Sequence, residues 1–258
     1  MKRKLPKPIQ QFLLEVAGIS KYFWRFWKEV FVPPYEMNEI TRQAYSVGFK
    51  SMPLVSVTAF IMGLVIVIQS RPALIEFGAG SYIPSMSALS IIREVGPLIT
   101  ALVCAGNIGS SISAELGSMK VTEQIDSMEV SGTNPFKFLA VSRIIACTIM
   151  IPVIVIYADV ISLFGSYAGA NIKGEISFNL FFAQVFERLS FNDVSPAFIK
   201  SFFFGFSIGL IGCYKGFTST KGTEGVGKAA NSSVVISLFL VILLDMVAVQ
   251  VASIFNII

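Results

Sequence analysis

Histidine is absent from this sequence of 258 residues, and charged residues make up only 14% of it. The absence of imidazole excludes catalysis by histidine and most transition-metal sites. The scarcity of charge excludes an ordinary soluble domain, in which about 25% of the residues are charged. Hydrophobic residues make up 54% of the chain. These values indicate a helical membrane protein with several spans, because backbone polar groups in lipid must be paired within the chain.

Cysteine is also scarce. The three cysteines, Cys104, Cys147 and Cys213, stand far apart in apolar segments. This placement favours packing as small hydrophobic residues over disulfide or metal chemistry. The sequence shows no thiol beside a base and no pair of carboxylates that would mark a soluble catalytic pocket. We therefore expect a non-catalytic chain that binds no metal, no cofactor and no nucleic acid.

The chain does contain five long apolar segments. Each has about the 20 residues that an α-helix needs to cross a bilayer, or more. The predicted fold class is therefore an all-α integral membrane protein, in which residues 35–258 form one five-span domain. Residues 171–195 are expected to be an external connection, and the glycine-rich residues 215–228 a flexible one. The expected spans are approximately residues 51–70, 87–113, 143–170, 196–214 and 229–257.

Residues 1–34 precede this domain. They begin with a basic segment and continue with apolar residues that recur every three or four positions up to Phe31. This pattern predicts an amphipathic helix that ends at Pro33 and Pro34. Because the helix combines basic and aromatic residues, we expect it to lie in the headgroup plane of the membrane as an interfacial helix.

Basic residues are unevenly distributed over the connections between spans. With a cytoplasmic N-terminus, the cytoplasmic segments would be residues 1–50, 114–143 and 215–228. These segments hold fifteen of the twenty Lys and Arg residues, and the external connections hold three. Since Lys and Arg accumulate on the cytoplasmic side, we predict a cytoplasmic N-terminus and a C-terminus on the opposite side.

A polar stretch from residue 115 to about residue 130 interrupts the apolar chain between the second and third spans. Its apolar and acidic residues follow helical spacing, which predicts a short amphipathic helix outside the membrane, capped by Thr122. The side expected to face the spans carries Val121, Ile125 and Met128. The opposite side is expected to be open to a partner.

Five charged residues lie within the expected spans. Arg93 and Glu94 are adjacent and point about 100° apart on a helix, so each needs a different partner. Lys200 lies near the outer end of the fourth span, and Asp159 and Asp245 are single acids in the third and fifth. For the first three, a salt link that fixes helix packing and contact with a lipid headgroup or water both stay open. For each Asp three roles stay open: a proton-binding site, a partner in helix packing, or a residue that lines a water-filled cavity.

Glycine patterns have two interpretations. The run from Gly222 to Ala229 resembles a phosphate-binding loop, but Ala229 stands where Ser or Thr is needed and no strand precedes it. We therefore expect no nucleotide site in this chain. Other glycines are spaced four residues apart, as in helices that pack closely, and we expect them to pack spans of one chain. These pairs are Gly165 and Gly169, Gly205 and Gly209, and Gly212 and Gly216, and we expect the same of Gly106 and Gly109, which are three residues apart.

Three runs of residues carry a family resemblance. They read Arg93-Glu-Val-Gly-Pro-Leu-Ile-Thr-Ala101, Ala105-Gly-Asn-Ile-Gly-Ser110 and Ala114-Glu-Leu-Gly-Ser-Met-Lys-Val-Thr-Glu-Gln-Ile-Asp-Ser-Met128. The last pattern is long and unusual. On these residues the chain resembles the MlaE-type permeases over roughly residues 40–257. One departure is Asn107, where many relatives carry a basic residue.

The resemblance implies a function and partners. MlaE-type permeases are the membrane subunits of bacterial ABC systems that move phospholipids between the inner and outer membranes. It implies a permease homodimer in the inner membrane of a diderm bacterium, with a periplasmic C-terminus. A periplasmic MCE-domain protein and a cytoplasmic ATPase, which holds ATP and Mg²⁺, would complete the complex.

The resemblance also implies residue roles. It identifies the helix at residues 115–130 as a coupling helix that docks on the ATPase, and it implies a lipid cavity near Arg93, Glu94 and Lys200. The expected coupling residues are Glu115, Glu123, Gln124, Asp126 and Glu129. Two competing hypotheses stay open. One is an ion-coupled secondary transporter that uses Asp159 or Asp245, and the other is a membrane scaffold that transports nothing.

Overall fold

A computed structural model describes residues 7–33, 35–172, 174, 176–220 and 222–254. The described part of the chain is helical and contains no strand, which confirms the predicted all-α class. The basic segment at residues 1–6 and the end of the fifth predicted span, residues 255–257, lie outside the described residues. Among the described residues, five helical stretches are long and apolar enough to cross a membrane: Met37–Glu76, Gly80–Val121, Phe136–Asn171, Phe191–Phe217 and Thr223–Ile254.

The predicted N-terminal helix is present as α1 (Lys7–Val30), and it packs against the ends of two spans. The Tyr22 ring lies 4.8 Å from the Phe136 ring and 5.6 Å from the Tyr214 ring. Burial in this cluster raises the pKa of the Tyr22 hydroxyl well above its usual value, so the hydroxyl stays neutral. Trp24 and Phe31 remain exposed on the other side. The interfacial position of α1 stays a prediction.

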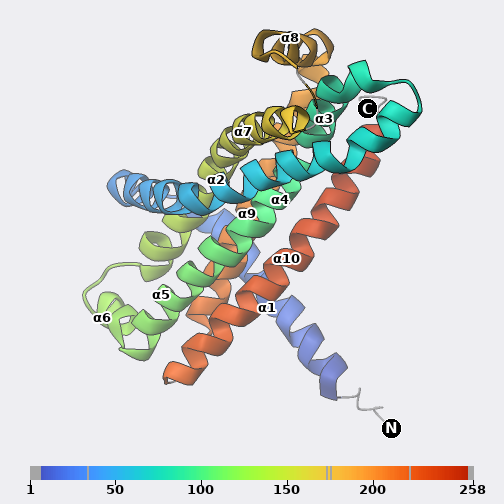
Figure 1. Ribbon diagram of the computed structural model, residues 1–258. Coiled ribbons are helices and arrows are strands. Elements are labelled where there is room, and N and C mark those ends of the chain that lie inside the picture. Colours follow the sequence, from blue (N-terminus) through green and yellow to red (C-terminus); the bar gives the residue numbers. More distant parts are fainter. Residues whose placement is uncertain (1–6, 34, 173, 175, 221, 255–258) are drawn as a thin grey trace.

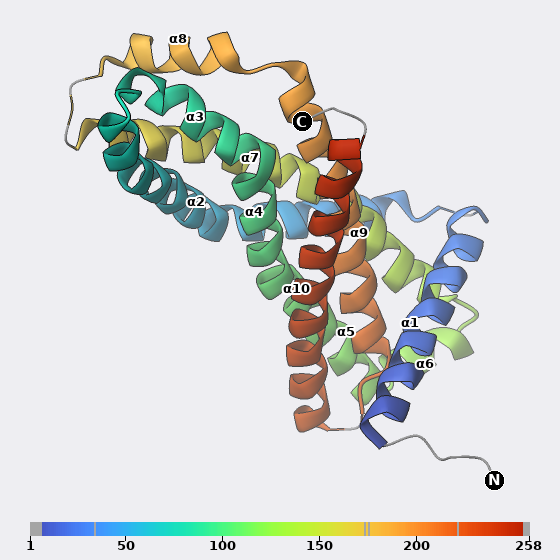
Figure 2. The same ribbon diagram turned by 90° about the vertical axis from the view of Figure 1, so that its right-hand side faces the viewer.

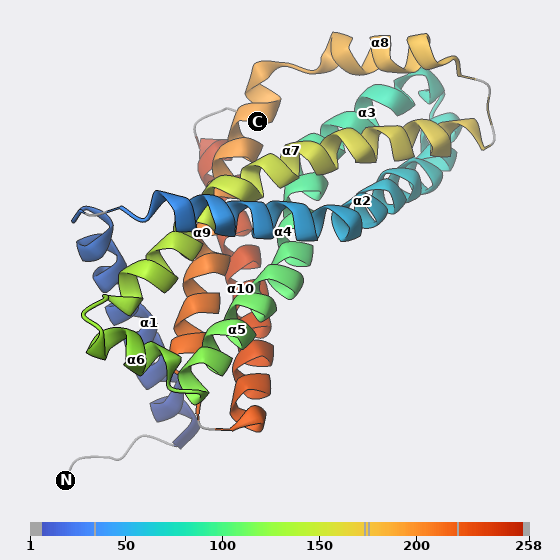
Figure 3. The same cartoon turned by 90° about the vertical axis from the view of Figure 1, so that its left-hand side faces the viewer.

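The first and third spans, α2 (Met37–Glu76) and α7 (Ser142–Asn171), lie side by side (Figure 3). Their backbones touch because small residues meet at the interface. A Cβ on Gly63 would overlap the carbonyl of Ser162, and a Cβ on Gly165 would overlap that of Phe60. The Ser162 hydroxyl donates to the carbonyl of Ala59 at 2.9 Å. A π-helical segment, η4 (Phe136–Val141), precedes α7.

The second span is a chain of helical segments. Two of them are π-helical turns, which are wider than α-helix and often occur at functional sites. The first π-turn ends just before Pro97, whose ring would clash with the carbonyl four residues earlier in a regular helix. The segments are η1 (Gly80–Tyr82), α3 (Ile83–Ser90), η2 (Ile91–Val95), α4 (Gly96–Cys104), η3 (Ala105–Gly109) and α5 (Ser110–Val121).

The fourth span, α9 (Phe191–Phe217), contacts its neighbours through glycines. A Cβ on Gly205 would lie 2.5 Å from the carbonyl oxygen of Cys147 on α7. A Cβ on Gly212 would lie 3.3 Å from the carbonyl oxygen of Gly109 at the end of η3. The expected packing role within one chain is therefore confirmed for the glycines spaced four residues apart, whereas a Cβ on Gly106 would meet nothing within 4 Å.

The fifth span, α10 (Thr223–Ile254), begins earlier than expected. The prediction of a flexible connection over residues 215–228 was wrong, because α9 continues to Phe217 and α10 starts at Thr223. Gly225 lies inside the first turn of α10, where a Cβ would overlap the carbonyl of Thr220. The glycines of this segment therefore allow a close turn between two helices.

The expected external connection over residues 171–195 contains a helix that was not predicted, α8 (Phe178–Arg188). Ser177 caps the helix by accepting a hydrogen bond from the Leu180 amide at 3.3 Å. Phe181 and Val185, four residues apart, are fully buried in a cluster with residues of α3. The period of these apolar residues is the sequence signal that predicts this helix.

The stretch predicted as one helix over residues 115–130 is divided in two. Its first part continues α5, and its second part is α6 (Gln124–Val130). The capping prediction for Thr122 was wrong, because its hydroxyl donates back to the Ser118 carbonyl at 2.9 Å. Glu123 then turns the chain with a left-handed φ of 59°.

The two ends of the molecule carry different elements (Figures 1 and 2). The helix α6, the first turns of α1 and the start of α10 lie at one end, and α8 and the end of α10 lie at the other. Of these elements, the ones predicted to be cytoplasmic thus lie at one end, and the ones predicted to lie on the opposite side of the membrane lie at the other. The orientation in a membrane stays a prediction.

Candidate functional site

Arg93, on the first π-turn, is bound to the start of α9. Its Nε donates to Oδ1 of Asp193 at 2.8 Å, and its Nη2 contacts the same oxygen. The other oxygen of Asp193 accepts from the amide of Ser190 at 2.7 Å and from its hydroxyl at 2.9 Å. Asp193 is therefore the third residue of α9, where its carboxylate completes a capping box with the N-cap residue Ser190, and it also anchors Arg93.

Glu94 and Lys200 form a second ion pair, about two turns further along α9 than Asp193. The Lys200 ammonium donates to Oε2 of Glu94 at 2.7 Å and to Oδ1 of Asp245 at 2.8 Å. One ammonium from α9 is thus shared by a carboxylate from the π-turn and a carboxylate from α10. Lys200 and Asp245 are buried, whereas Glu94 is partly exposed. As predicted, Arg93 and Glu94 have different partners, and the salt-link interpretation holds for Arg93, Glu94 and Lys200.

Lys200 also borders a groove between α9 and α10. The groove has a volume of about 370 Å³, and its walls are apolar apart from Lys200 and Ser195. Ligand pockets in proteins have volumes of about 300–1,000 Å³ with few polar groups. Phe203, Leu244 and Val251 are representative of the walls. The arrangement can accept an apolar chain next to a single charged cluster.

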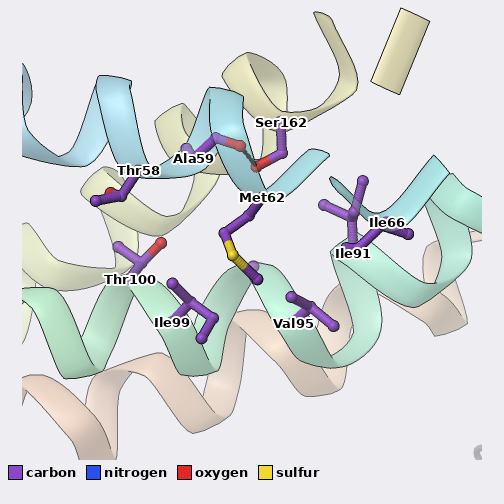
Figure 4. Close-up of a pocket in the computed structure, with 10 residues that line it drawn as sticks. Thr58, Ala59, Met62, Ile66, Ile91, Val95, Ile99, Thr100 and Ser162 are labelled. Carbon is purple, nitrogen blue, oxygen red and sulfur yellow. Dashed lines mark hydrogen bonds between the residues drawn. The ribbon is translucent and has the colours of Figure 1, made fainter. Parts of the chain in front are cut away.

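The space between α2, α4 and α7 is filled instead (Figure 4). Met62 of α2 points between Val95 and Ile99, and the remaining cavity is about 10 Å³. A single water needs about 10–15 Å³, so a lipid cannot enter here.

Asp159 borders the same region from α7. One of its carboxylate oxygens is buried without a hydrogen-bond partner in the described part of the chain. The carboxylate packs on Gly96, where a Cβ would overlap it. Asp159 therefore takes no part in the Lys200 ion pairs.

The predicted coupling residues of α6 share one exposed surface. Ile125 is buried and Met128 is partly buried, so the apolar side of α6 packs inward as expected. The Asp126 carboxylate accepts from Lys120 at 2.6 Å. Four of the predicted coupling residues are exposed here: Glu123, Gln124, Asp126 and Glu129.

Glu115 lies apart from this acidic surface. It projects from α5, and its Oε1 accepts from Nη2 of Arg143 at 2.8 Å. The Arg143 guanidinium is buried and also donates to the Leu139 carbonyl at 3.0 Å. Glu115 therefore joins α5 to α7, and its role in coupling stays a prediction.

Comparison with known proteins identifies the family. The model of a family described as permease MlaE matches residues 40–251, which is most of the chain. The chain belongs to the MlaE permease family. A relative from Rickettsia felis, named a probable ABC transporter permease protein, is 36% identical over 233 residues, 90% of each chain. Relatives with the same description come from Pyropia yezoensis, 32% identical over 93% of this chain and 91% of the relative, and from Synechocystis, 36% identical over 76% and 74%.

As an MlaE-family permease, the chain is the membrane subunit of an ABC transporter, and such a subunit works with an ATPase. The ion-paired side chains around Arg93 and Lys200 include one residue, Asp193, that our sequence interpretation did not propose for the site. The pattern Ser190-Phe-Asn-Asp193 before an apolar run is a capping signature that could have found it. The pairing of Lys200 with Asp245 has no such signal, because 45 residues separate the two.

Proposed function

We propose that this MlaE-family permease moves phospholipids between the inner and outer membranes of a diderm bacterium. In this proposal two copies of the chain form a homodimer in the inner membrane, and a periplasmic MCE-domain protein receives or delivers the lipid. A cytoplasmic ATPase supplies the energy, and ATP and Mg²⁺ are bound by that subunit. The observation that carries the proposal is the apolar groove beside Lys200.

The chemistry of this groove suits a phospholipid. A lipid needs an apolar surface for its acyl chains and a polar group at the boundary of its headgroup. The groove offers apolar side chains from α9 and α10 with the Lys200 ammonium at one wall. Because Lys200 already serves Glu94 and Asp245, the headgroup phosphate would compete with a carboxylate for the ammonium. This exchange would link lipid binding to the positions of η2, α9 and α10.

The surface of α6 suits a coupling role. Four polar or acidic residues are exposed there, and a buried Ile125 anchors the helix to the spans. ATP-driven closure of the ATPase would press on α6 and, through α5, move the second span. Fifteen of the twenty basic residues lie in the segments that would share this side, which supports a cytoplasmic location of α6 and a periplasmic C-terminus.

Two measurements test the proposal. Mass spectrometry of lipids retained by the purified complex should detect phospholipid, and Lys200→Met should reduce the retained amount. ATPase activity of the complex should fall strongly in Glu129→Lys, which reverses charge on the exposed side of α6. Glu187→Lys is the matched control, since Glu187 is an exposed acid on the short helix α8 at the opposite end. Absence of retained lipid, together with equal ATPase activity in the two charge reversals, would contradict the proposal.

A further inference from the structure

A second cleft lies between the first half of α2 and the junction of η3 with α5. Its volume is about 60 Å³, and it shares no residue with the groove beside Lys200. A site for one water needs about 10–15 Å³, so the cleft has room for several waters or for a small polar group. Its polar lining includes Ser46 and Lys50 from α2, and Asn107, Ser111 and Glu115 from the second span.

One wall of the cleft offers donors for an anion. The exposed Lys50 ammonium makes no ion pair or hydrogen bond within the part of the chain that the structure describes. The amide nitrogen of Asn107 reaches only a distant partner, the Ser51 hydroxyl at 3.4 Å. The hydroxyl groups of Ser46 and Ser111 complete a set of donors that matches the oxygens of a phosphate group.

The same cleft holds an oriented carboxylate. Oε1 of Glu115 accepts from the buried Arg143 at 2.8 Å, while Oε2 has no hydrogen-bond partner among the described residues. The Glu115 side chain is 51% exposed, so a ligand can reach the second oxygen. A carboxylate has lone pairs for several donors and can accept from Arg143 and from an ammonium group together. The cleft thus presents a cation and an accessible carboxylate to one ligand.

The position of the cleft along α2 suits a lipid headgroup. Lys50 is the last charge before the uncharged residues 51–70. Tyr45 and Phe49, on the same turns of α2, are exposed and stack with ring centroids 5.3 Å apart. Aromatic residues of this kind gather where apolar membrane meets water. With the predicted sidedness of the spans, this places the cleft at headgroup depth in the leaflet on the α6 side.

We propose that this cleft binds the zwitterionic headgroup of a phospholipid, with its phosphate at Lys50 and its ammonium at Glu115. The proposal rests on the proposed lipid transport and adds the class of headgroup that is recognised in the leaflet on the α6 side. Phosphatidylethanolamine has the required chemistry. Phosphatidylglycerol offers the phosphate without the ammonium, so the two lipids separate the roles of the two walls.

The test uses the permease with its ATPase in nanodiscs that contain equal amounts of phosphatidylethanolamine and phosphatidylglycerol. Native mass spectrometry measures which lipids are retained. The intact protein should retain more phosphatidylethanolamine. Lys50→Gln should reduce retention of both lipids by up to about fivefold, the upper end of the range expected for an exposed charged contact. Glu115→Gln should reduce only phosphatidylethanolamine and so remove the preference.

The control is Lys228→Gln, since Lys228 is an exposed lysine on α10 that does not line the cleft. Its lipid retention should equal that of the intact protein. Equal retention and an unchanged lipid ratio in Lys50→Gln would overturn the proposal even if Glu115→Gln fails to fold without its contact to Arg143. Displacement of the lipid by inorganic phosphate at millimolar concentration would also overturn it and identify a free-phosphate site.

Transport of labelled phosphatidylethanolamine in the same preparations separates this proposal from the proposed function. If the intact complex transports lipid and Lys50→Gln retains as much of both lipids as the intact protein, the headgroup site is refuted and lipid transport stands. If Lys50→Gln loses retention of both lipids but no preparation transports lipid, the site stands and the transport function is refuted.

Discussion

Replacing Lys200 by methionine should destabilise the protein more than any other change in its charged cluster. The substitution keeps the length and apolar stem of the side chain and removes only the ammonium. It leaves the Asp245 carboxylate, whose side chain is 9% exposed, without its ion-pair partner. Water cannot replace the lost partner at such a buried position. Removal of one member of a buried ion pair costs about 3–5 kcal/mol, and we expect about 3 kcal/mol here.

The two carboxylates that share Lys200 should respond differently. Glu94→Gln should cost about 1 kcal/mol or less, because the Glu94 side chain is 41% exposed and its ion pair is screened by solvent. Adding Asp245→Asn to Lys200→Met should recover about 2 kcal/mol, since the unpaired buried charge is then gone. A double-mutant cycle over Lys200 and Asp245 isolates this interaction from the cost of each substitution alone.

The assay is the free energy of unfolding of the purified protein, measured by SDS titration in mixed micelles. Helix content followed by circular dichroism reports the transition for the four members of the cycle. A coupling energy below about 0.5 kcal/mol between Lys200 and Asp245 would refute the reasoning, because mutations at independent sites already deviate from additivity by that amount. Equal costs for Lys200→Met and Glu94→Gln would refute it as well, because burial would then not set the magnitude.

Three further predictions use the same unfolding assay. Gly63→Ala should lower the free energy of unfolding by more than about 2 kcal/mol, because the added methyl group would overlap a carbonyl of α7. The control Gly227→Ala, in open space on α10, should raise it by about 0.5–1 kcal/mol. Equal effects of the two substitutions would contradict the close contact between α2 and α7. Arg143→Met should lower the free energy of unfolding by only about 1 kcal/mol, since its partner Glu115 is half exposed and can be hydrated. A loss of stability as large as that of Lys200→Met would contradict this role of solvent exposure. Asp159→Asn should change stability by less than about 0.5 kcal/mol and leave ATP-driven transport intact, because one Asp159 oxygen has no partner within the described residues. Transport that follows an ion gradient and is lost in Asp159→Asn would instead support the ion-coupled hypothesis.

The sequence predicted the class of the fold and the number of spans, because these depend on local properties. Length and hydrophobicity decide whether a segment can cross a bilayer, and helical periodicity decides which side of α6 packs inward. Ile125 is buried and Glu129 is exposed, as their spacing predicts. Errors occurred where the local signal was weak or was overlooked. The four-residue spacing of Phe181 and Val185 in α8 was hidden within a polar segment, and the glycines near Gly225 were interpreted as flexible although they allow a tight helix junction.

The partners of the charged residues were decided only by the tertiary structure. Sequence reasoning showed that Arg93 and Glu94 need different partners, but it could not show that Asp193 and Lys200 are those partners, 100 and 106 residues away. These pairs depend on how closely the helices pack and on how the π-turns rotate the second span, and neither follows from the spacing of residues along one segment. In the same way, Glu115 belongs by sequence to the polar stretch of the coupling helix, yet Arg143 holds it at the cleft beside α2. An ion pair between distant segments has no local pattern, because its energy depends on burial and geometry that exist only once the helices have packed.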